Sequence, residues 1–326
     1  MVKLIIQIPC YNEAESLPQT LAGMPAHIPG ISHIETLIID DGSNDDTAAV
    51  AQQLGVDHII RHSHNRGLAA VFQTGLNECL RRGADIIVNT DGDNQYPGQE
   101  IPRLVAPILA GQADMVIGDR QTHTIAHFSP LKRFLQRWGS RVVRWASGTA
   151  VPDATSGFRA ISRDAAMQLT IFTTYTYTLE TIIQAGKKGL RIESVPIQVN
   201  PPLRQSRLIK SNWSFVKRNA ATILRIYTYY EPLRTFTYIS LVFLLPGLFL
   251  LARFMYFYLS DLSGVGRYVQ SVVIGGTLTI VGVLIFILGV IADLIAANRL
   301  LSERILYSLK RLELNNSGDH RQKASD

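Results

Sequence analysis

Short apolar runs alternate with helix-forming segments along the first part of the chain, up to Arg120. Apolar runs of this kind, bounded by turn residues, are typical of buried parallel strands. The expected strands are residues 4–8, 34–39, 58–61, 86–88 and 115–118. The expected helices begin near Ser16 and near Asn44, and two more cover about 68–82 and 102–110. This alternation predicts an α/β fold, a mainly parallel sheet flanked by helices and joined by right-handed crossovers.

Polar clusters follow three of the expected strands. Pro9, which is expected to stop the first strand, opens the cluster Pro-Cys-Tyr-Asn-Glu. Asp-Asp-Gly-Ser at 40–43 follows the second strand, and Asp-Gly-Asp at 91–93 follows the fourth. Active sites of open α/β sheets lie at the carboxyl ends of the strands, so these clusters are expected to converge on one edge. No GxGxxG follows the first strand, which argues against a plain dinucleotide-binding fold.

The Asp-Gly-Asp cluster is a candidate site for a hard divalent cation. In an extended backbone Asp91 and Asp93 project to the same side, and Gly92 lets another group approach the main chain closely. Two carboxylates do not enclose a metal, so Mg²⁺ or Mn²⁺ here would keep positions for water and for phosphate oxygens. A solvated turn is the ordinary alternative. A calcium loop fails, because Tyr96 replaces the required glycine and Glu100 comes too early.

Composition indicates a membrane-associated segment and a reducing compartment. The mean hydropathy of +0.12 is high for a soluble protein, and the apolar excess follows Phe236. The net charge of +6 favours an anionic partner, lipid or phosphate, and no long basic run indicates nucleic acid. Cys10 and Cys79 form no CxxC pair, which suits a reducing compartment. No signal sequence precedes the first strand, so the N-terminal domain is expected in the cytosol.

The apolar excess divides into two segments that predict a transmembrane hairpin, residues 235–293. Residues 236–259 and 269–292 are each long enough to cross a hydrocarbon core of about 30 Å. In the second span Gly275, Gly282 and Gly289 recur every seventh residue, which favours close packing on the first span or on another subunit. Basic residues flank the hairpin, whereas the turn holds only one, so both termini are expected in the cytosol.

Two further segments complete the expected organisation. Residues 209–234 contain an amphipathic stretch, at 211–225, whose apolar and basic residues interleave as in an interfacial helix. An ordinary helix facing a protein core is the alternative for this stretch. Residues 294–326 are expected to form a cytosolic C-terminal helix, with a disordered tail from Asn315. Residues 1–208 are then expected to form the cytosolic domain of a multi-pass protein of the plasma or inner membrane.

Taken together, the three polar clusters resemble those of family 2 glycosyltransferases with the GT-A fold. The resemblance covers about residues 3–217. It implies that the first two clusters hold the nucleoside of a sugar donor and that the third holds Mg²⁺ or Mn²⁺ on its diphosphate. The residues that it implies around the nucleotide sugar are Pro9, Tyr11, Glu13, Ile39, Asp41 and Gly92, and those on the metal are Asp91, Asp93 and Gln95.

Downstream motifs resemble the dolichol-phosphate mannose synthase branch of that family. Asp-Ala-Thr-Ser-Gly-Phe-Arg-Ala at 153–160 is similar to an acceptor-side motif that usually has Pro in second place. Gln-Tyr-Pro at 95–97 replaces the commoner Gln-His-Pro. Residues 195–197 and 206–208 resemble the strand and basic loop that close over the nucleotide. Pro-Pro-Leu-Arg at 201–204 departs from the Arg and Gly of many relatives.

The resemblance implies a reaction at the membrane, transfer of a hexose from a nucleoside-diphosphate sugar to a polyprenyl phosphate, dolichyl or undecaprenyl, with inversion. GDP-mannose is favoured as donor, with UDP-glucose next. Because a phosphate acceptor is already anionic, it needs positioning more than a general base. The candidates to position it are Arg120, Lys132, Arg133 and Ser156, and those to clamp the diphosphate are Arg204 and Arg207. A flippase partner and a homo-oligomer both fit this organisation.

Two other functions stay open on the sequence. If the acceptor were a hydroxyl of a glycan or glycolipid, Asp119 would be the general base. Processive synthases of that kind generally carry Gln-x-x-Arg-Trp, and residues 141–145 lack the Gln. A non-catalytic nucleotide-sugar binder that serves a transporter is the third possibility. The histidine pairs 62/64 and 123/127 have zinc-like spacing but no carboxylate or cysteine companions, which favours surface or hydrogen-bonded histidines.

Overall fold

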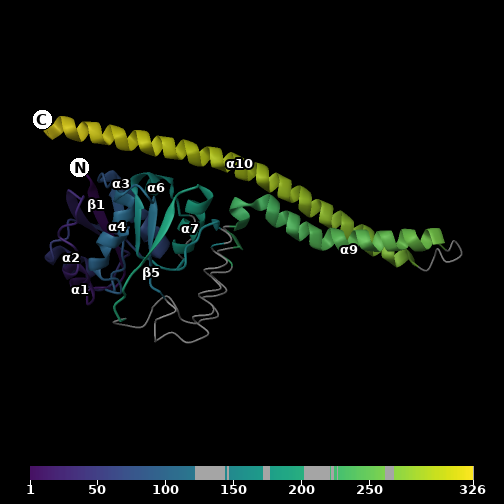
Figure 1. Cartoon of the computed structure of the whole chain (residues 1–326), viewed down its shortest axis with the longest axis horizontal. Helices are drawn as coiled ribbons and strands as arrows, with labels where there is room; N and C mark the ends of the chain where they lie inside the picture. The colour runs from purple at the N-terminus through teal and green to yellow at the C-terminus, as the bar shows by residue number, and fades with distance from the viewer. Residues whose placement is uncertain are drawn as a thin grey trace. The chain divides into compact units, whose positions relative to one another are not determined.

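The computed structural model describes residues 1–121, 144, 147–171, 177–201, 221, 224–225, 227–260 and 268–325. The chain divides into two compact units (Figure 1), Met1–Ile223 with Leu306–Asp326, and Leu224–Ile305. Strands of the first unit are β1 (Lys3–Cys10), β2 (His33–Asp40), β3 (His58–Arg61), β4 (Ile86–Asn89), β5 (Met115–Asp119), β6 (Arg159–Ser162) and β7 (Ile192–Pro196). Its helices are α1 (Leu17–Ala22), α2 (Thr47–Gln53), α3 (Leu68–Arg81), η1 (Gly98–Glu100), α4 (Ile101–Leu109), α6 (Arg163–Gln168) and α7 (Thr178–Lys187).

The strands form one seven-stranded sheet in the order β3-β2-β1-β4-β6-β5-β7. Four of the pairings are parallel, and β6 runs antiparallel to both of its neighbours, β4 and β5. The predicted mainly parallel α/β sheet is therefore confirmed. Because β6 is antiparallel, its beginning at Arg159 lies beside the end of β4 at Asn89. The segment before β6 is thus brought to the strand edge that carries the Asp-Gly-Asp cluster.

The first strand continues past Pro9, which the sequence predicts as its end. β1 pairs with β2 as far as Cys10, whereas β4 accompanies β1 only from Leu4 to Gln7. At Pro9 one side of β1 therefore pairs with no strand of the described sheet. A proline lacks the N–H that a central strand would donate, and it is tolerated where one side of the strand needs no such bond. The extension carries Cys10 and the start of the first polar cluster to the sheet edge.

Alternating side chains of β1 contact different helices on the two faces of the sheet. Leu4, Ile6 and Ile8 belong to the buried core that includes residues of α4. Gln7 points to the other face, where a side chain at Gly75 of α3 would collide with its Oε1. Side chains alternate between the two faces of any strand, and in β1 both sets are buried from Leu4 to Cys10. Helices on both faces leave the strand ends as the open part of the sheet (Figure 1).

The second unit contains α9 (Pro232–Ser260) and most of α10 (Val269–Ser325). Both helices are long and apolar enough to cross a membrane. Their faces pack closely: Cβ atoms at Gly282 and Gly289 would lie 2.6 Å from Leu244 and Phe236 of α9. Across the same contact, Ser240 Oγ donates to the Gly282 carbonyl at 2.8 Å. The predicted glycine face therefore packs on the first apolar helix.

The C-terminal tail differs from the disorder that the sequence predicts from Asn315 onward. The α10 backbone is helical as far as Ser325. The helix continues through Asn-Asn-Ser-Gly-Asp at 315–319, although these are weak helix formers, because a helix already formed extends at little cost. The stretch 211–225, predicted to be an interfacial helix, lies almost wholly outside the described residues.

Candidate active site

The loop after β4 carries the predicted metal ligands, and short contacts fix its shape. Asp93 Oδ1 accepts the N–H of Gln95 at 3.1 Å, and Asn94 between them has a positive φ of 57°. Asn200, beyond β7, donates its N–H to the Gln95 carbonyl and its Nδ2 to the Asn94 carbonyl, both at 2.9 Å. The loop is therefore held by the segment beyond β7 as well as by its own turn.

Asp91 lies at the head of this loop in an electrostatically unfavourable place. Burial and the neighbouring charge of Asp93 raise the pKa of Asp91 to about 7, far above the ordinary value. Both carboxylates remain partly exposed, as does Gln95. Oxygen ligands with excess negative charge and an open side suit Mg²⁺ or Mn²⁺.

A cation at these residues would need ligands from outside the chain. Within the described ranges no group of three or more His, Cys, Asp or Glu side chains is arranged to hold a metal. Asp91, Asp93 and Gln95 offer an open set of oxygens, which water and phosphate would complete. The residues therefore fit a metal that is held jointly with an anionic substrate.

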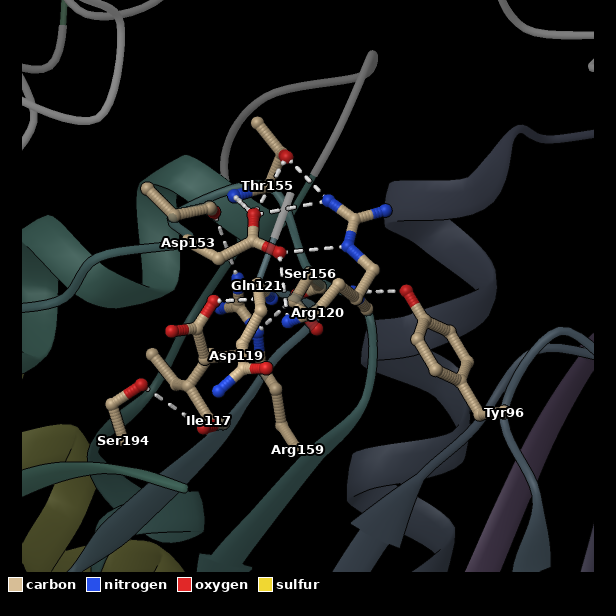
Figure 2. A network of polar contacts seen from close by, with 12 residues as sticks. Tyr96, Ile117, Asp119, Arg120, Gln121, Asp153, Thr155, Ser156, Arg159 and Ser194 are labelled. Carbon is tan, nitrogen blue, oxygen red and sulfur yellow. Dashed lines mark hydrogen bonds and ion pairs between the residues drawn. The ribbon is translucent and has the colours of Figure 1, made fainter. Parts of the chain in front are cut away.

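A buried ion pair between Arg120 and Asp153 lies after β5 (Figure 2). Arg120 follows β5 and donates from Nε to Asp153 Oδ2 at 2.7 Å and from Nη2 to Oδ1 at 3.0 Å. Nη2 also donates to Thr155 Oγ1 at 2.7 Å. Burial alone would raise the pKa of Asp153, but the Arg120 guanidinium holds it below its ordinary value. Arg120 is therefore fixed and charged, and its Nη1 makes no hydrogen bond with a described residue.

Arg159 holds the segment 153–159, which carries Asp153 and Thr155. Its side chain is fully buried, and burial lowers its pKa to about 10. It donates from Nε to the Ser156 carbonyl at 2.8 Å, from Nη2 to the Ala154 carbonyl at 3.1 Å, and from Nη1 to Thr181 Oγ1. These contacts tie 153–159 to α7. Arg159 thus organises the backbone that presents Asp153 to Arg120.

The first two polar clusters are tied to each other and to the metal loop. The Asn12 N–H donates to Ser43 Oγ, and the Asn44 N–H donates to Asn12 Oδ1, both at 2.8 Å. The Ser16 hydroxyl lies 2.9 Å from Glu13 Oε2 and 2.8 Å from the Gly92 carbonyl, so it can donate to either. The three clusters that the sequence indicated are therefore brought together at one edge of the sheet.

Two residues that are predicted to lie around the nucleoside make contacts within the protein. Asp41 accepts the N–H groups of Arg66 and Gly67 at 2.9 and 2.8 Å, and His62 Nδ1 lies 2.8 Å from it. Its carboxylate fixes the loop after β3, and its contact with a nucleoside stays a prediction. Ile39 is fully buried, with its side chain against Gly75 of α3. Any contact of Ile39 with a nucleoside would be through its backbone.

The remaining predicted residues differ in how accessible they are. Asp119 ends β5, is partly exposed, and accepts the Gln121 N–H at 2.9 Å. Ser156 is fully buried, so its hydroxyl is not at the surface where an acceptor phosphate would arrive. Among the other residues predicted around the nucleotide sugar, Tyr11 is partly exposed, whereas Pro9, Glu13 and Gly92 are buried. The residues outside the described ranges are Lys132, Arg133, Arg204 and Arg207.

An open pocket of about 420 Å³ lies at the ends of β2 and β3, beside Asp41. Its lining residues are Gly42, Ser43, Asn44, Arg61, His62 and Ser63. No sequence pattern pointed to Arg61, whose Nη2 donates to the Ser43 carbonyl at 3.0 Å. Sequence reasoning also missed the roles of Asp153 and Arg159, although both lie in a motif that it singled out.

Fold and site together define a transferase domain of the GT-A type, a mainly parallel sheet with an open carboxylate pair at the end of a central strand. Residues 5–170 match the family model described as Glycosyl transferase family 2. The chain belongs to this family and is a glycosyltransferase. A non-catalytic binder is thereby disfavoured.

Two curated relatives and one solved structure illustrate the likeness. The chain is 29% identical over 206 residues to polyprenol monophosphomannose synthase of Mycolicibacterium smegmatis, covering 60% of this chain and 76% of the relative. It is 27% identical over 212 residues to UDP-N-acetylglucosamine–dolichyl-phosphate N-acetylglucosaminyltransferase of Methanococcus voltae, covering 59% and 83%. Glucosyl-3-phosphoglycerate synthase of Mycobacterium tuberculosis, solved with Mn²⁺, UDP-glucose and phosphoglyceric acid, superposes with a TM-score of 0.57. That match covers 69% of this chain and 80% of the other, and its 18% identity shows the fold alone.

Proposed function

We propose that this glycosyltransferase moves a hexose from a nucleoside-diphosphate sugar to a polyprenyl phosphate at a membrane, with inversion at the anomeric carbon. The observation that carries the proposal is the placement of a fixed, charged Arg120 beside the open carboxylate pair of Asp91 and Asp93. The carboxylate pair suits a metal-bound diphosphate, and the neighbouring guanidinium of Arg120 suits a second phosphate. The printed names of the relatives support a polyprenyl phosphate as that second substrate.

Each group has a separate task in this reaction. A divalent cation held by Asp91, Asp93 and Gln95 would offset the charge that develops on the leaving diphosphate. Arg120 positions the acceptor phosphate with its available Nη1, since its other nitrogens hold Asp153 and Thr155. An anionic acceptor needs no general base, so Asp119 has no proton to remove. Lys132 and Arg133 for the acceptor, and Arg204 and Arg207 for the diphosphate, complete the proposal.

The membrane arrangement is part of the proposal. We infer that residues 1–208 form the cytosolic catalytic domain and that α9 and α10 cross the bilayer as a hairpin, with both termini in the cytosol. The apolar length of the two helices and the basic residues that flank them support this orientation. A lipid acceptor would then enter the site from the membrane surface.

The test is a transfer assay on the purified full-length protein in detergent with Mg²⁺ or Mn²⁺. The donors are labelled GDP-mannose, UDP-glucose and other GDP- and UDP-sugars. The acceptors are a short polyprenyl phosphate, the matching polyprenol, and a glycan or glycolipid with free hydroxyl groups. We expect one donor to label the phosphate lipid, with sugar released by mild acid, and no label on the polyprenol. We favour GDP-mannose, with UDP-glucose next.

Two variants calibrate this assay. Asp93→Asn should abolish transfer, whereas Asp114→Asn, which alters an exposed ion pair with Arg191 away from the site, should not. Label on the hydroxyl of a glycan or glycolipid, with none on polyprenyl phosphate, would refute the proposal. It would instead make Asp119 the general base of a different transferase.

A further inference from the structure

Gly157 forms a wall against the Asp91 carboxylate. A Cβ atom at Gly157 would lie 3.1 and 3.2 Å from the two Asp91 oxygens and 3.0 Å from Tyr177 Oη. Contacts this short are tighter than an ordinary Cβ makes, so a side chain here would displace the Asp91 carboxylate or the Tyr177 hydroxyl. Asp91 itself makes no hydrogen bond with a described residue, so this wall, not a donor, limits where its carboxylate lies.

The peptide groups of Gly157 are held from both sides. Its N–H donates to Tyr96 Oη at 3.3 Å. Its carbonyl accepts from Asn89 Nδ2 at 2.8 Å and from Tyr177 Oη at 3.3 Å. Asn89 Nδ2 also donates to Tyr177 Oη at 2.8 Å. Three side chains from three parts of the chain therefore converge on one glycine.

These three side chains are in turn rigidly packed. The Tyr96 ring stacks on Phe158 with centroids 5.0 Å apart, and the Tyr177 ring stacks on Phe72 at 3.8 Å. Asn89 Oδ1 accepts from Gln7 Nε2 at 2.9 Å. All are buried, so little motion is open to them. Tyr96 also belongs to the metal loop, so it links that loop directly to the segment that carries Asp153.

We propose that Tyr96, together with Asn89 and Tyr177, positions the Asp91 carboxylate for metal binding through the Gly157 peptide. The inference rests on the proposed function, because it concerns the same metal site. The three residues touch neither metal nor substrate and act only by placing Gly157. Because these residues only position a metal ligand, removing their hydrogen bonds to Gly157 should weaken metal binding more than it lowers turnover at saturating metal.

The test is Mn²⁺ binding by the full-length protein in detergent, followed by the electron paramagnetic resonance signal of free Mn²⁺, with and without UDP or GDP. Tyr96→Phe removes only the Oη and keeps the ring stack. We expect it to raise the Mn²⁺ dissociation constant about 2- to 10-fold, the range for one hydrogen bond. Turnover at saturating Mn²⁺ should stay within about twofold of wild type. Tyr177→Phe should act in the same direction.

A control separates positioning from general destabilisation. Val105→Ala truncates a buried residue of α4 and should lower the unfolding temperature without changing Mn²⁺ affinity. Gly157→Ala should weaken Mn²⁺ binding more than Tyr96→Phe, if it folds. Tyr96→Phe remains decisive in either case, because it adds no atoms.

The outcomes distinguish this inference from the proposed function. Wild-type Mn²⁺ binding that disappears in Asp93→Asn establishes the metal site itself. If that holds and Tyr96→Phe binds Mn²⁺ as tightly as wild type, or loses turnover alone, the positioning role is overturned while the function stands. No Mn²⁺ binding by the wild type, with or without nucleotide, overturns both.

Discussion

Replacing Asp153 by asparagine should destabilise the catalytic domain and impair transfer together. The side chains of Arg120 and Asp153 are only 12% and 2% exposed, and two charge-assisted hydrogen bonds join them. Breaking one partner of such a pair typically costs about 3–5 kcal/mol, because the other charge stays buried. The amide that replaces the carboxylate can still accept one hydrogen bond, so we take about 3 kcal/mol, the lower end of that range. For a domain of this size that lowers the melting temperature by roughly 6–12 °C.

The two cysteines provide an assay confined to this domain. The chain has only Cys10 and Cys79, both lie in the sheet unit, and both are buried. Burial raises the pKa of each thiol, which keeps it unreactive in the folded state. The rate of labelling by a thiol reagent against temperature therefore reports unfolding of the catalytic domain, even while the apolar helices stay in detergent.

A double variant isolates the ion pair. Arg120→Met should also destabilise, but Arg120→Met combined with Asp153→Asn leaves no unpaired charge and should recover part of the lost stability. Transfer should not recover, because the arginine that we propose to position the acceptor phosphate is gone. Destabilisations that simply add in the double variant would refute the reasoning, since independent side chains have no coupling energy.

The difference in stability between wild type and Asp153→Asn depends on pH with a definite sign. The pKa of Asp153 is lowered in the folded protein, so its contribution is complete above the unfolded value of about 3.9. It is lost only as the pH falls through the lower folded pKa. The stability gap between wild type and Asp153→Asn should therefore be constant from about pH 5 to 8. A gap that narrows within that window would contradict the lowered pKa.

Three further outcomes are expected. Asp93→Asn should reduce transfer by orders of magnitude with an unchanged melting temperature; near-normal turnover with normal metal dependence would remove Asp93 from the metal site. Asp41→Asn should loosen the loop after β3 and raise KM for the donor several-fold, with KM for the lipid as the unchanged control. Gly282→Leu should separate the two apolar helices and increase their protease sensitivity, whereas Gly276→Leu, with no neighbour within 4 Å, should not.

The strand framework was predictable because its signals are local. The run Ile86–Ile87–Val88 is a continuous apolar stretch, and a strand buried on both faces needs only such a stretch. The three polar clusters follow these strands directly, so their convergence followed from parallel topology alone. The expected strand at 58–61 agrees with β3 at both ends.

β6 was missed for a physical reason. It has only four residues, Arg-Ala-Ile-Ser, and its first side chain is a fully buried arginine. A charged residue inside a strand breaks the apolar run on which strand prediction depends. Arg159 is tolerated because carbonyl oxygens and Thr181 accept its hydrogen bonds. Those partners become neighbours only in the folded chain, so no local pattern could indicate them.

Partners that become neighbours only in the folded chain also explain why charged site residues could be predicted from the sequence but their ion-pair partners could not. Burial disfavours the charged form of Asp91, and the neighbouring charges that act on it are those of Asp93, Glu13, Arg120 and Arg159. Arg120 is paired in turn with Asp153. Among these described residues Asp91, Asp93, Glu13 and Asp153 carry carboxylates, and Arg120 and Arg159 carry guanidinium groups. With all six ionised, two negative charges are in excess. One divalent cation would balance that excess, so in the function proposed above the carboxylate pair would take up an anionic substrate together with its metal.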